Sequence, residues 1–282
     1  MIEKIALLTD SACDLPKEFI ERFCIKVLPL SVIYPDKIYQ DRITIEPQEV
    51  YDRMPDEIPT TSMPTPHEIT SILEEIRNEG FTHVLAVHLS SGLSGTYEAV
   101  RMVAQEFEDL VINVFDTRTL SIATGWMVLE AARDIASGLS FQKIMDNLHQ
   151  IQPRVKVYYV LETLEYLRRG GRIGAVAAML GQFLHLKPII SVNQEGKYFT
   201  YAKARGRQKS IEKLAEIVEK AVQRGPIKLA VMHGGAREEF QRLLEKLQHL
   251  PNIKELIASD ISPALGVHTG PGLLGVCVVE QT

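Results

Sequence analysis

The alternation of short apolar runs with longer helical patterns is the feature that most constrains the fold of this chain. An apolar run at 4–8 is closed by polar residues at 9–11, and a helical pattern follows Pro16. Strands separated by helices of this length pair in parallel, so the pattern predicts an α/β fold with helices covering the sheet. We expect strands at 4–8, 25–33, 83–88 and 110–115, and helices after Pro16 and at 66–79, 95–107, 120–137 and 140–150.

The second half of the chain, which begins near Pro153, has a different pattern. The tetrapeptide Asn-Gln-Glu-Gly at 193–196 lies between two apolar runs and predicts a hairpin. We therefore expect two α/β domains, an N-terminal domain at 1–153 with a parallel sheet and a C-terminal domain at 154–282 with a mixed sheet. The strands expected in the second domain are 155–161, 188–193, 197–204, 227–232, 253–258 and 273–279, and the helices are 207–223 and 236–248.

The composition favours an ordinary globular protein that does not bind nucleic acid. The 282 residues carry a formal net charge of -5, so they create no general basic field. The 3 cysteines have no paired or metal-like spacing, which argues against a disulfide framework. The N-terminus lacks the features of a signal peptide, and no apolar run approaches the roughly 18 residues of a membrane span. We therefore expect a cytoplasmic protein.

The segment 59–66, Pro-Thr-Thr-Ser-Met-Pro-Thr-Pro, precedes a predicted helix. Thr65 and Glu68 form a capping box with proline at the first helical position, so the helix should begin there. Thr61 and Ser62 then lie just ahead of a helix N-terminus. Their hydroxyls either cap turns or bind a ligand, and the local pattern leaves both interpretations open.

A second polar segment, 88–97, lies between a predicted strand and a predicted helix. Open α/β sheets bind ligands at this carboxyl end of a strand. Ser94 is suited to cap the helix, and the backbone amides that follow it would face an anion. The glycine spacing matches neither a nucleophile elbow nor a Walker loop. Ser94 is thus a candidate for anion binding, with helix capping alone as the alternative.

Two glycine-rich segments complete the polar features. The first, 166–174, places three arginines beside three glycines, which suits a carboxylate or a phosphate. A solvated charged loop is the usual explanation of such a cluster. The second, 266–272, places His268 in a predicted loop just before the last strand, where a packed core histidine is not expected. His268 is either a site residue or a turn residue without a further role.

Together these segments resemble the DegV family. They occur in the family's order and cover nearly the whole chain, and five of them with ordinary spacing are specific where one is not. Met63 departs from the family pattern, because many members have a polar glutamine there. The resemblance implies two α/β domains with a fatty acid bound between or beneath them. The matching motifs are Thr9-Asp10-Ser11, Thr61-Ser62-x-Pro64, Ser91-Gly92-Leu93-Ser94-Gly95-Thr96-Tyr97, Tyr166-Leu167-x-x-Gly170-Gly171-Arg172-Ile173-Gly174 and Gly266-x-His268-x-Gly270-Pro271-Gly272.

The resemblance also implies the role of FakB, the fatty acid-binding subunit of bacterial fatty acid kinase. In that system a separate kinase subunit phosphorylates the bound acid to an acyl phosphate, which feeds phospholipid synthesis. The implied ligand is one long-chain fatty acid such as palmitate or oleate, and the implied partners are the kinase subunit and, transiently, a membrane or an acyltransferase. The resemblance implies no cofactor, no metal and no catalytic residue in this subunit.

Carried onto this sequence, the family's carboxylate-binding positions are Thr61, Ser62 and Ser94. Arg172 and His268 match positions near the head group, which the resemblance assigns to acyl phosphate handling and kinase docking. A buried carboxylate is costly unless several donors receive it, and two helix N-termini with hydroxyl caps supply such donors. The tail needs an apolar tunnel, for which the small residues of the stretches 122–127 and 175–180 leave room, although helix core is the ordinary interpretation of both stretches.

Two other classes of function stay open. A serine hydrolase would use Ser94 with His268 as its base, but no acidic partner is evident and the elbow pattern is broken. A regulatory or nucleic-acid-binding protein would use a patch formed by the arginines at 168, 169, 172, 205 and 207, against the acidic net charge. The sequence contains no phosphate loop with a lysine, so phosphoryl transfer is expected to come from a partner.

Overall fold

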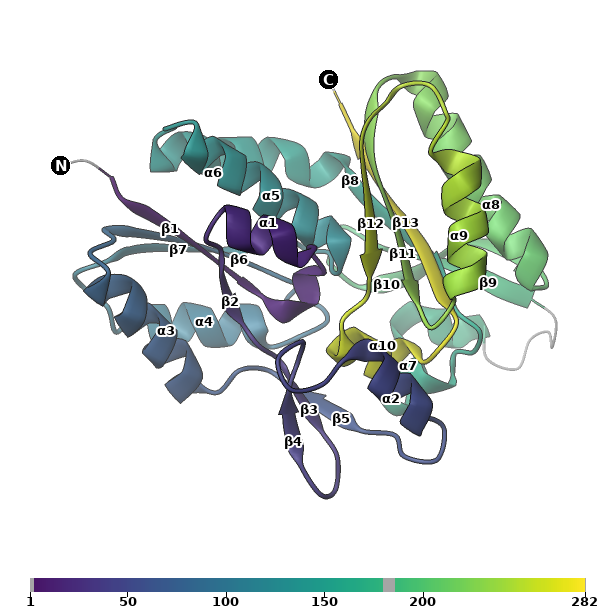
Figure 1. Ribbon diagram of the computed structural model, residues 1–282, viewed down its shortest axis with the longest axis horizontal. Helices are drawn as coiled ribbons and strands as arrows, with labels where there is room; N and C mark the ends of the chain where they lie inside the picture. Colours follow the sequence, from purple (N-terminus) through teal and green to yellow (C-terminus); the bar gives the residue numbers. More distant parts are fainter. Residues whose placement is uncertain (1–2, 180–185, 282) are drawn as a thin grey trace.

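The computed structural model of the protein describes residues 3–179 and 186–281. Within these ranges the strands form three sheets, with helices around and between them (Figure 1). The first half of the chain, drawn from purple to teal, holds a four-stranded and a three-stranded sheet. The second half, drawn from teal to yellow, holds a six-stranded sheet.

The four-stranded sheet is parallel, as predicted, with the strand order β2-β1-β6-β7. Its strands are β1 (Ile5–Asp10), β2 (Lys26–Leu28), β6 (His83–His88) and β7 (Val111–Asp116), and the elements around it are η1 (Ser11–Cys13), α1 (Lys17–Arg22), α3 (Pro66–Asn78), α4 (Thr96–Ala104), α5 (Ile122–Ala136) and α6 (Phe141–Ile151). Successive residues of a strand face opposite sides of the sheet. Ala6 and Leu8 accordingly pack with α3 and α4, whereas Leu7 packs with α5.

A three-stranded antiparallel sheet lies below the parallel one in Figure 1 and was not predicted. The single strand expected at 25–33 is divided at Pro29, which has no backbone N–H to donate to a sheet ladder. The residues before Pro29 pair with β1, and those after it enter the second sheet. This sheet has the order β4-β3-β5 and consists of β3 (Ser31–Ile33), β4 (Ile38–Gln40) and β5 (Thr60–Ser62), with α2 (Pro47–Arg53) between β4 and β5 in the chain.

The six-stranded sheet is mixed, as predicted, with the order β10-β9-β8-β13-β11-β12 and one parallel pair, β11 with β12. The predicted turn at 193–196 joins the antiparallel strands β9 and β10. Its elements are β8 (Val155–Val160), β9 (Leu186–Val192), β10 (Tyr198–Arg205), β11 (Ile227–Gly234), β12 (Ile253–Asp260) and β13 (Leu273–Glu280), with η2 (Gln152–Arg154), α7 (Glu165–Arg169), η3 (Gly174–Met179), α8 (Arg207–Arg224), α9 (Arg237–Leu247) and α10 (Pro263–Thr269). Helices α8 and α9 cover one face of this sheet.

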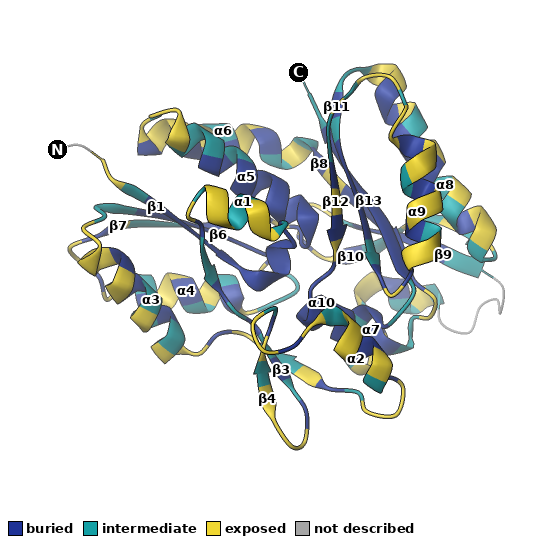
Figure 2. Cartoon of the chain, in the orientation of Figure 1, coloured by how far each residue is buried: buried dark blue, intermediate teal, exposed yellow. Residues whose placement is uncertain are grey.

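Helix α5 lies between the parallel sheet and the six-stranded sheet, and its residues from Ile122 to Leu129 are all buried (Figure 2). It contacts β1 and β6 on one side and β8 and β13 on the other. One hydrophobic cluster therefore contains residues of both halves of the chain, from Leu7 in β1 to Val279 in β13. The division into domains at 153 and 154 remains a proposal. The change of sheet between α6 and β8 supports it, although the halves share this core.

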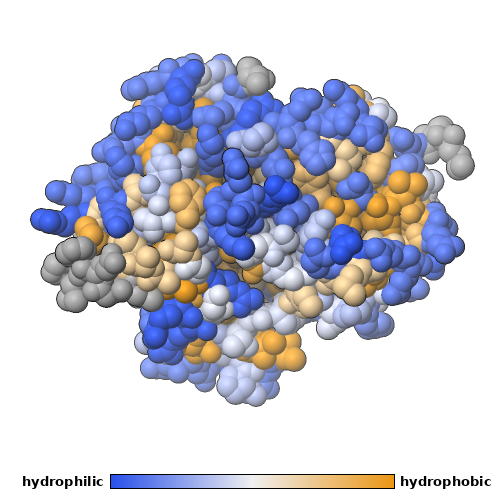
Figure 3. Space-filling view, turned by 180° about the vertical axis from the view of Figure 1, so that it is seen from behind, coloured by the Kyte–Doolittle hydropathy of each residue, from blue (hydrophilic) through white to orange (hydrophobic). Residues whose placement is uncertain are grey.

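Among the described residues, no helix combines the length and the apolar composition that a membrane span requires. Viewed from behind, the surface carries mostly hydrophilic side chains, with apolar ones in separate patches (Figure 3). Large apolar side chains that are exposed include those of Ile38, Met102 and Val111, which lie on three different elements or loops.

Candidate functional site

The loop after β6 carries Ser94 and is fixed to the end of β1. The buried carboxylate of Asp10 accepts hydrogen bonds from the backbone N–H groups of Ala12 and Leu89 at 3.2 and 2.9 Å. Helix α4 begins at Thr96, directly after Gly95. Ser94 Oγ accepts from Thr96 N at 3.3 Å and lies 2.9 Å from Thr96 Oγ1. The sequence predicted Ser94 as the N-cap of this helix, but the N-cap position is Gly95, and the Ser94 hydroxyl accepts from the first helical N–H instead.

Strand β5 carries Thr61 and Ser62, so the two residues are held by a sheet rather than by a free loop. Thr61 pairs with Val32 in the neighbouring β3. The predicted capping box is present: Thr65 Oγ1 accepts from Glu68 N at 3.3 Å, and Thr65 N donates to the Glu68 carboxylate at 2.7 Å. Thr61 Oγ1 lies 2.7 Å from His268 Nε2, and this hydrogen bond links the first half of the chain to the second.

His268 lies on a helix and not in a loop, which corrects the sequence prediction for 266–272. Helix α10 begins after Ser262, whose hydroxyl accepts from Leu265 N at 3.4 Å, and it ends at Thr269. Gly266 lies inside this helix, and the ring of Tyr51 packs against it so closely that a Cβ at Gly266 would be 2.9 Å from the Tyr51 hydroxyl oxygen. Glycine here allows close packing and does not end the helix.

Burial lowers the pKa of His268 to about 4, and the positive charge of Arg172 adds to this effect. The imidazole is therefore neutral at physiological pH. Its Nδ1 has no hydrogen-bond partner among the described residues. Gly170 lies directly against this nitrogen, because a Cβ at that position would be 2.1 Å from Nδ1. Of the glycines in the segment 166–174, Gly170 is the one that makes room for His268.

Arg172 follows α7 and reaches the loop that carries Ser94. Its Nη1 donates to the Gly170 carbonyl oxygen at 2.6 Å, and its Nε donates to the Leu93 carbonyl oxygen at 3.5 Å. The neighbouring Arg168 and Arg169 both bind Glu165. Among these three arginines, Arg172 is the one that is directed to the site.

All five predicted site residues line one cavity of about 150 Å³, which we call the junction cavity. Strand β5, the loop before α4, the segment after α7 and helix α10 each contribute to it. Five leucines and Tyr198 provide apolar walls that the sequence analysis did not identify. The complete lining consists of Leu30, Thr61, Ser62, Met63, Leu89, Leu93, Ser94, Gly95, Leu120, Arg172, Tyr198, Ala264, Leu265 and His268.

A narrow apolar gap of about 10 Å³ continues from the junction cavity and shares Leu120, Tyr198 and Leu265 with it. The gap also borders Val157 and Tyr159 of β8. Neither space is lined by the stretch 122–127. Those residues are packed inside the shared core, and a Cβ at Gly125 would meet the Cys13 carbonyl oxygen at 2.5 Å. Of the second stretch suggested for the tail, 175–179 lies at η3 and residue 180 is outside the described residues.

The polar groups of the junction cavity suit an anion with an apolar tail. Among the described residues, the lining contains no carboxylate, while Arg172 supplies a permanent positive charge. The hydroxyl groups of Thr61, Ser62 and Ser94 line the same cavity and provide hydrogen-bond donors. A buried anion is tolerated only where such donors and charges receive it. The leucine side chains around them offer nothing to a polar tail.

The geometry gives little support to the serine hydrolase alternative. Ser94 Oγ is hydrogen-bonded to Thr96, and His268 Nε2 is hydrogen-bonded to Thr61, so each of the two side chains has a different partner. A triad also needs an acid on the other ring nitrogen of the histidine, and that nitrogen is unpartnered among the described residues. The proposed arginine patch is also weakened, because Arg207 binds Glu239 just as Arg168 and Arg169 bind Glu165.

The model of the family described as "Uncharacterised protein, DegV family" matches residues 4–281. The chain belongs to the DegV family. A DegV domain-containing protein of Clostridium acetobutylicum is 44% identical over 280 residues, which cover 99% of this chain and 100% of the relative. The DegV resemblance therefore extends along the whole length of both proteins.

Two solved structures of fatty acid-binding proteins have the same fold. A DegV family protein from Thermus thermophilus, described as binding fatty acid, has a TM-score of 0.92 and 32% identity, and covers 99% of this chain and 100% of its own. A stearic acid-binding protein from Eubacterium ventriosum has a TM-score of 0.87 and 27% identity, and covers 99% and 98%. The predicted combination of a parallel and a mixed sheet is thus the DegV fold.

Proposed function

We propose that this protein is a cytoplasmic carrier that binds one long-chain fatty acid, such as palmitate or oleate, and presents it to a separate kinase subunit. The observation that carries the proposal is the junction cavity, in which three hydroxyls, a neutral histidine and one arginine face leucine side chains. The fatty acid-binding function of the Thermus thermophilus relative gives independent support.

In this proposal the carboxylate lies against Thr61, Ser62 and Ser94. Ser94 has a suitable position, because it precedes α4 and the N-terminus of a helix favours negative charge. Arg172 adds a positive charge beside the carboxylate. The tail extends past Leu120 and Leu265 into the apolar gap. Each buried methylene contributes about 0.8 kcal/mol, so the tail supplies most of the affinity.

The carboxylate end also adjoins a second space, which supports presentation to a partner. A cavity of about 420 Å³ shares Thr61, Arg172 and His268 with the junction cavity and also borders Arg169 and Tyr166. In our proposal a kinase subunit docks here and phosphorylates the bound acid to an acyl phosphate, for use in phospholipid synthesis. Arg172 and His268 then border the phosphoryl group, and transfer to a membrane or an acyltransferase follows.

The binding function is tested by weighing the protein with its ligand. We expect native mass spectrometry of protein purified from bacteria to detect one fatty acid per chain, and we expect a denatured extract to release it unmodified. Stripped protein should take up added palmitate or oleate. A protein that yields no fatty acid and takes up neither compound contradicts the proposal.

The kinase partnership is tested separately. The protein is incubated with ATP, magnesium and fatty acid, with or without a bacterial fatty acid kinase subunit. Acyl phosphate should form only when both proteins are present. Formation by this protein alone would show that it is itself an enzyme. Binding of fatty acid without acyl phosphate in either mixture would leave a carrier with a different partner.

A further inference from the structure

The junction cavity is too small for the ligand that we propose. A cavity of about 150 Å³ in a protein core accommodates a ligand of the size of benzene. The adjoining gap adds about 10 Å³. A long acyl chain therefore needs room beyond these two spaces, and the direction of the gap indicates where that room lies.

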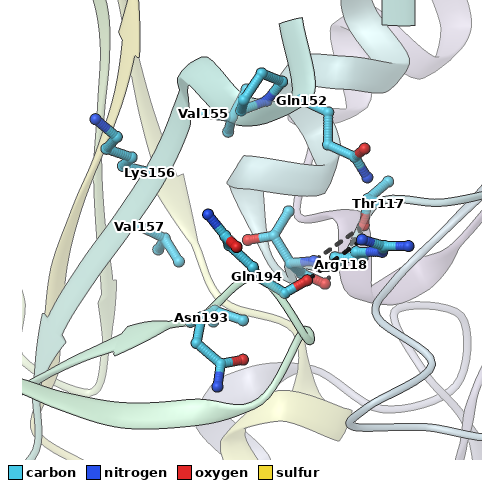
Figure 4. A pocket seen from close by; sticks show the side chains of 11 residues that line it. Thr117, Arg118, Gln152, Val155, Lys156, Val157, Asn193 and Gln194 are labelled. Carbon is cyan, nitrogen blue, oxygen red and sulfur yellow. Dashed lines mark hydrogen bonds between the residues drawn. The ribbon is translucent and has the colours of Figure 1, made fainter. Parts of the chain in front are cut away.

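The gap leads along β8 toward a larger space, the distal cavity, of about 400 Å³ (Figure 4). Val155, Val157 and Tyr159 lie on the same face of β8, because alternate residues of a strand share a face. Tyr159 borders the gap, Val157 borders both spaces, and Val155 borders the distal cavity alone. Leu120 and Thr119, which are neighbours in the chain, line the gap and the distal cavity respectively.

The inner walls of the distal cavity are apolar. Val155 and Val157 are buried, Val192 at the end of β9 is partly buried, and the three side chains face the cavity together with Pro153. Lys156 lies between the two valines of β8, and Figure 4 shows its amine turned away from the cavity. That amine binds Glu280 at 3.3 Å. An apolar chain is the ligand that such walls accept.

The polar residues around the distal cavity are already engaged with the protein. The Gln152 side chain donates to the Asp116 carbonyl oxygen at 2.7 Å, and Asn193 Oδ1 accepts from Glu195 N and Lys197 N. Polar groups that are satisfied internally do not select a polar ligand.

Arg118, at the solvent side of the distal cavity, is less firmly engaged with the protein than these polar residues. Its Nη1 donates to the Gln194 carbonyl oxygen at 3.4 Å, and it has no carboxylate partner among the described residues. The aliphatic part of an arginine covers apolar groups while its guanidinium stays in water. Arg118 and Gln194 are therefore suited to cover an apolar chain end.

We propose that the distal cavity receives the methyl end of long, linear acyl chains. The inference rests on the proposed function and extends it, because it assigns the end of the chain that lies farthest from the carboxylate. Short acids end at the gap. Longer acids pass Val157, and their last methylenes lie against Val155 and Val192. Leu120 and the tyrosine rings at the gap must shift to let the chain pass.

The cavity is tested by filling it from its edge. Affinities of laurate, myristate, palmitate and stearate are measured for the parent protein and for Val192→Trp. In the parent, affinity should rise about fourfold per buried methylene up to the longest acid. In Val192→Trp, stearate should lose at least tenfold in affinity while laurate is unchanged. Lys197→Trp, an exposed position on the same hairpin, is the matched control and should leave all four affinities unchanged.

A second experiment uses the unaltered protein and does not depend on how a variant folds. A stearate with a diazirine at its methyl end is bound and irradiated, and the labelled peptides are identified. We expect the label in peptides that contain 152–157 or 192–194. Labels confined to peptides that line the junction cavity contradict the proposal, as does a Val192→Trp protein that binds stearate like the parent. If no acid of any length binds, the proposed function fails first, so the two failures are distinguishable.

Discussion

At Ser94, one hydroxyl has enough hydrogen-bonding capacity for both a helix and a ligand. A hydroxyl carries one proton and two lone pairs. Thr96 N and Thr96 Oγ1 can occupy the two lone pairs, which leaves the proton free to point at a carboxylate. The sequence presented helix capping and ligand binding as alternatives, but in the structure the hydrogen bond from Thr96 N leaves Ser94 able to bind a ligand as well.

Replacement of Ser94 separates the two contributions. Ser94→Ala should weaken fatty acid binding by about 1.5–3 kcal/mol, because a hydrogen bond to a charged group is lost. It should also lower the free energy of unfolding of the unliganded protein by about 1 kcal/mol, because the hydrogen bond from Thr96 N at the start of α4 is lost. Calorimetric titration and urea unfolding measure the two quantities. Ser140→Ala removes the cap of α6 far from the cavity and should affect stability alone. Equal affinity of Ser94→Ala and the parent would refute the carboxylate assignment.

The buried imidazole of His268 makes stability depend on pH. The folded protein keeps His268 neutral down to about pH 4, whereas the unfolded chain takes up a proton near 6.5. The unfolded state then binds more protons, so stability falls as the pH falls from about 6.5 toward 4. Asp41 changes the stability in the opposite direction. Burial raises its pKa to about 6, so the stability that the protonated carboxyl group contributes is lost as the pH rises through that value.

A His268→Gln variant isolates the histidine, since Asp41 is present in both proteins. Between pH 7 and pH 5 the parent should lose about 2 kcal/mol more stability than the variant, the expected size for a pKa shift of this order. Urea unfolding at both pH values is the measurement. His67→Gln, an exposed position, serves as the control and should follow the parent. Parallel curves for His268→Gln and the parent would mean that the imidazole is not held neutral.

Among the elements, α10 depends on close packing with its neighbours, α2 and α7. Gly266 faces the ring of Tyr51, Gly270 faces the ring of Tyr166, and His268 lies against Gly170. The side chains that enter these spaces are large, so the glycines cannot be exchanged for alanine without movement. The helix carries three lining residues of the junction cavity, and its position therefore determines the width of that cavity.

Gly170→Ala should disturb the site without straining the backbone, because the φ of Gly170 is -73°. The added methyl group would overlap His268 Nδ1, and overpacking of this kind costs about 1–3 kcal/mol. We expect a lower melting temperature and weaker fatty acid binding, since the hydrogen bond between Thr61 and His268 must break or shift. Gly225→Ala, where nothing lies within 4 Å of the added Cβ, should match the parent in both measurements. A Gly170→Ala protein with unchanged binding would contradict this role of the glycine.

The elements that the sequence predicted well are those with a local signal. The capping box at Thr65 and the turn at 193–196 are examples, because neighbouring residues determine both. The end of β2 and the helix α10 were missed. Pro29 gave a local signal for the end of β2, but the sequence did not show that the residues after it join a different sheet. The glycines around His268 predicted a loop, whereas Gly266 provides space for Tyr51, a contact more than 200 residues away in the chain.

The site shows the same division. Ser94, Arg172 and His268 stand out as polar residues near glycines, which a sequence pattern reveals. Tyr198 and Leu265 line the cavity as well, but they lie in a strand and a helix whose apolar residues all look alike in sequence. The alternation of apolar and charged residues at the end of β10 could have indicated which face of that strand is turned inward. The tertiary contacts that select Leu265 could not.

Across the whole molecule, two buried carboxylates of the first half hold the start of α10. Asp14 accepts from Ser262 N at 2.8 Å, and Asp41 accepts from Ala264 N at 2.9 Å. Arg42 binds Asp14 at 3.1 Å and donates to the Asp260 carbonyl oxygen at 2.5 Å. Burial raises the pKa of both carboxyl groups, so their ionised forms depend on these partners. The cluster therefore connects the two halves of the chain beside the junction cavity.

Removal of the arginine from this cluster should be costly. Arg42→Met leaves Asp14 buried without its cation, and we expect the free energy of unfolding to fall by about 3 kcal/mol. The double variant Asp14→Asn with Arg42→Met should recover most of that loss, because the uncompensated charge is gone. Chemical denaturation of both proteins provides the comparison. Arg101→Met breaks the exposed pair with Glu98 and should change stability by less than about 1 kcal/mol. Additive losses in the double variant would show that Arg42 does not act through Asp14.

The position of α5 between two sheets has a consequence for how the protein melts. Neither half can lose its structure without exposing the apolar surface of this helix to water. Unfolding of one half therefore lowers the stability of the other half as well. Calorimetry should record a single heat-absorption peak whose van't Hoff enthalpy equals the calorimetric enthalpy. A ligand bound beside α5 should move that whole peak to higher temperature and should not split it into two.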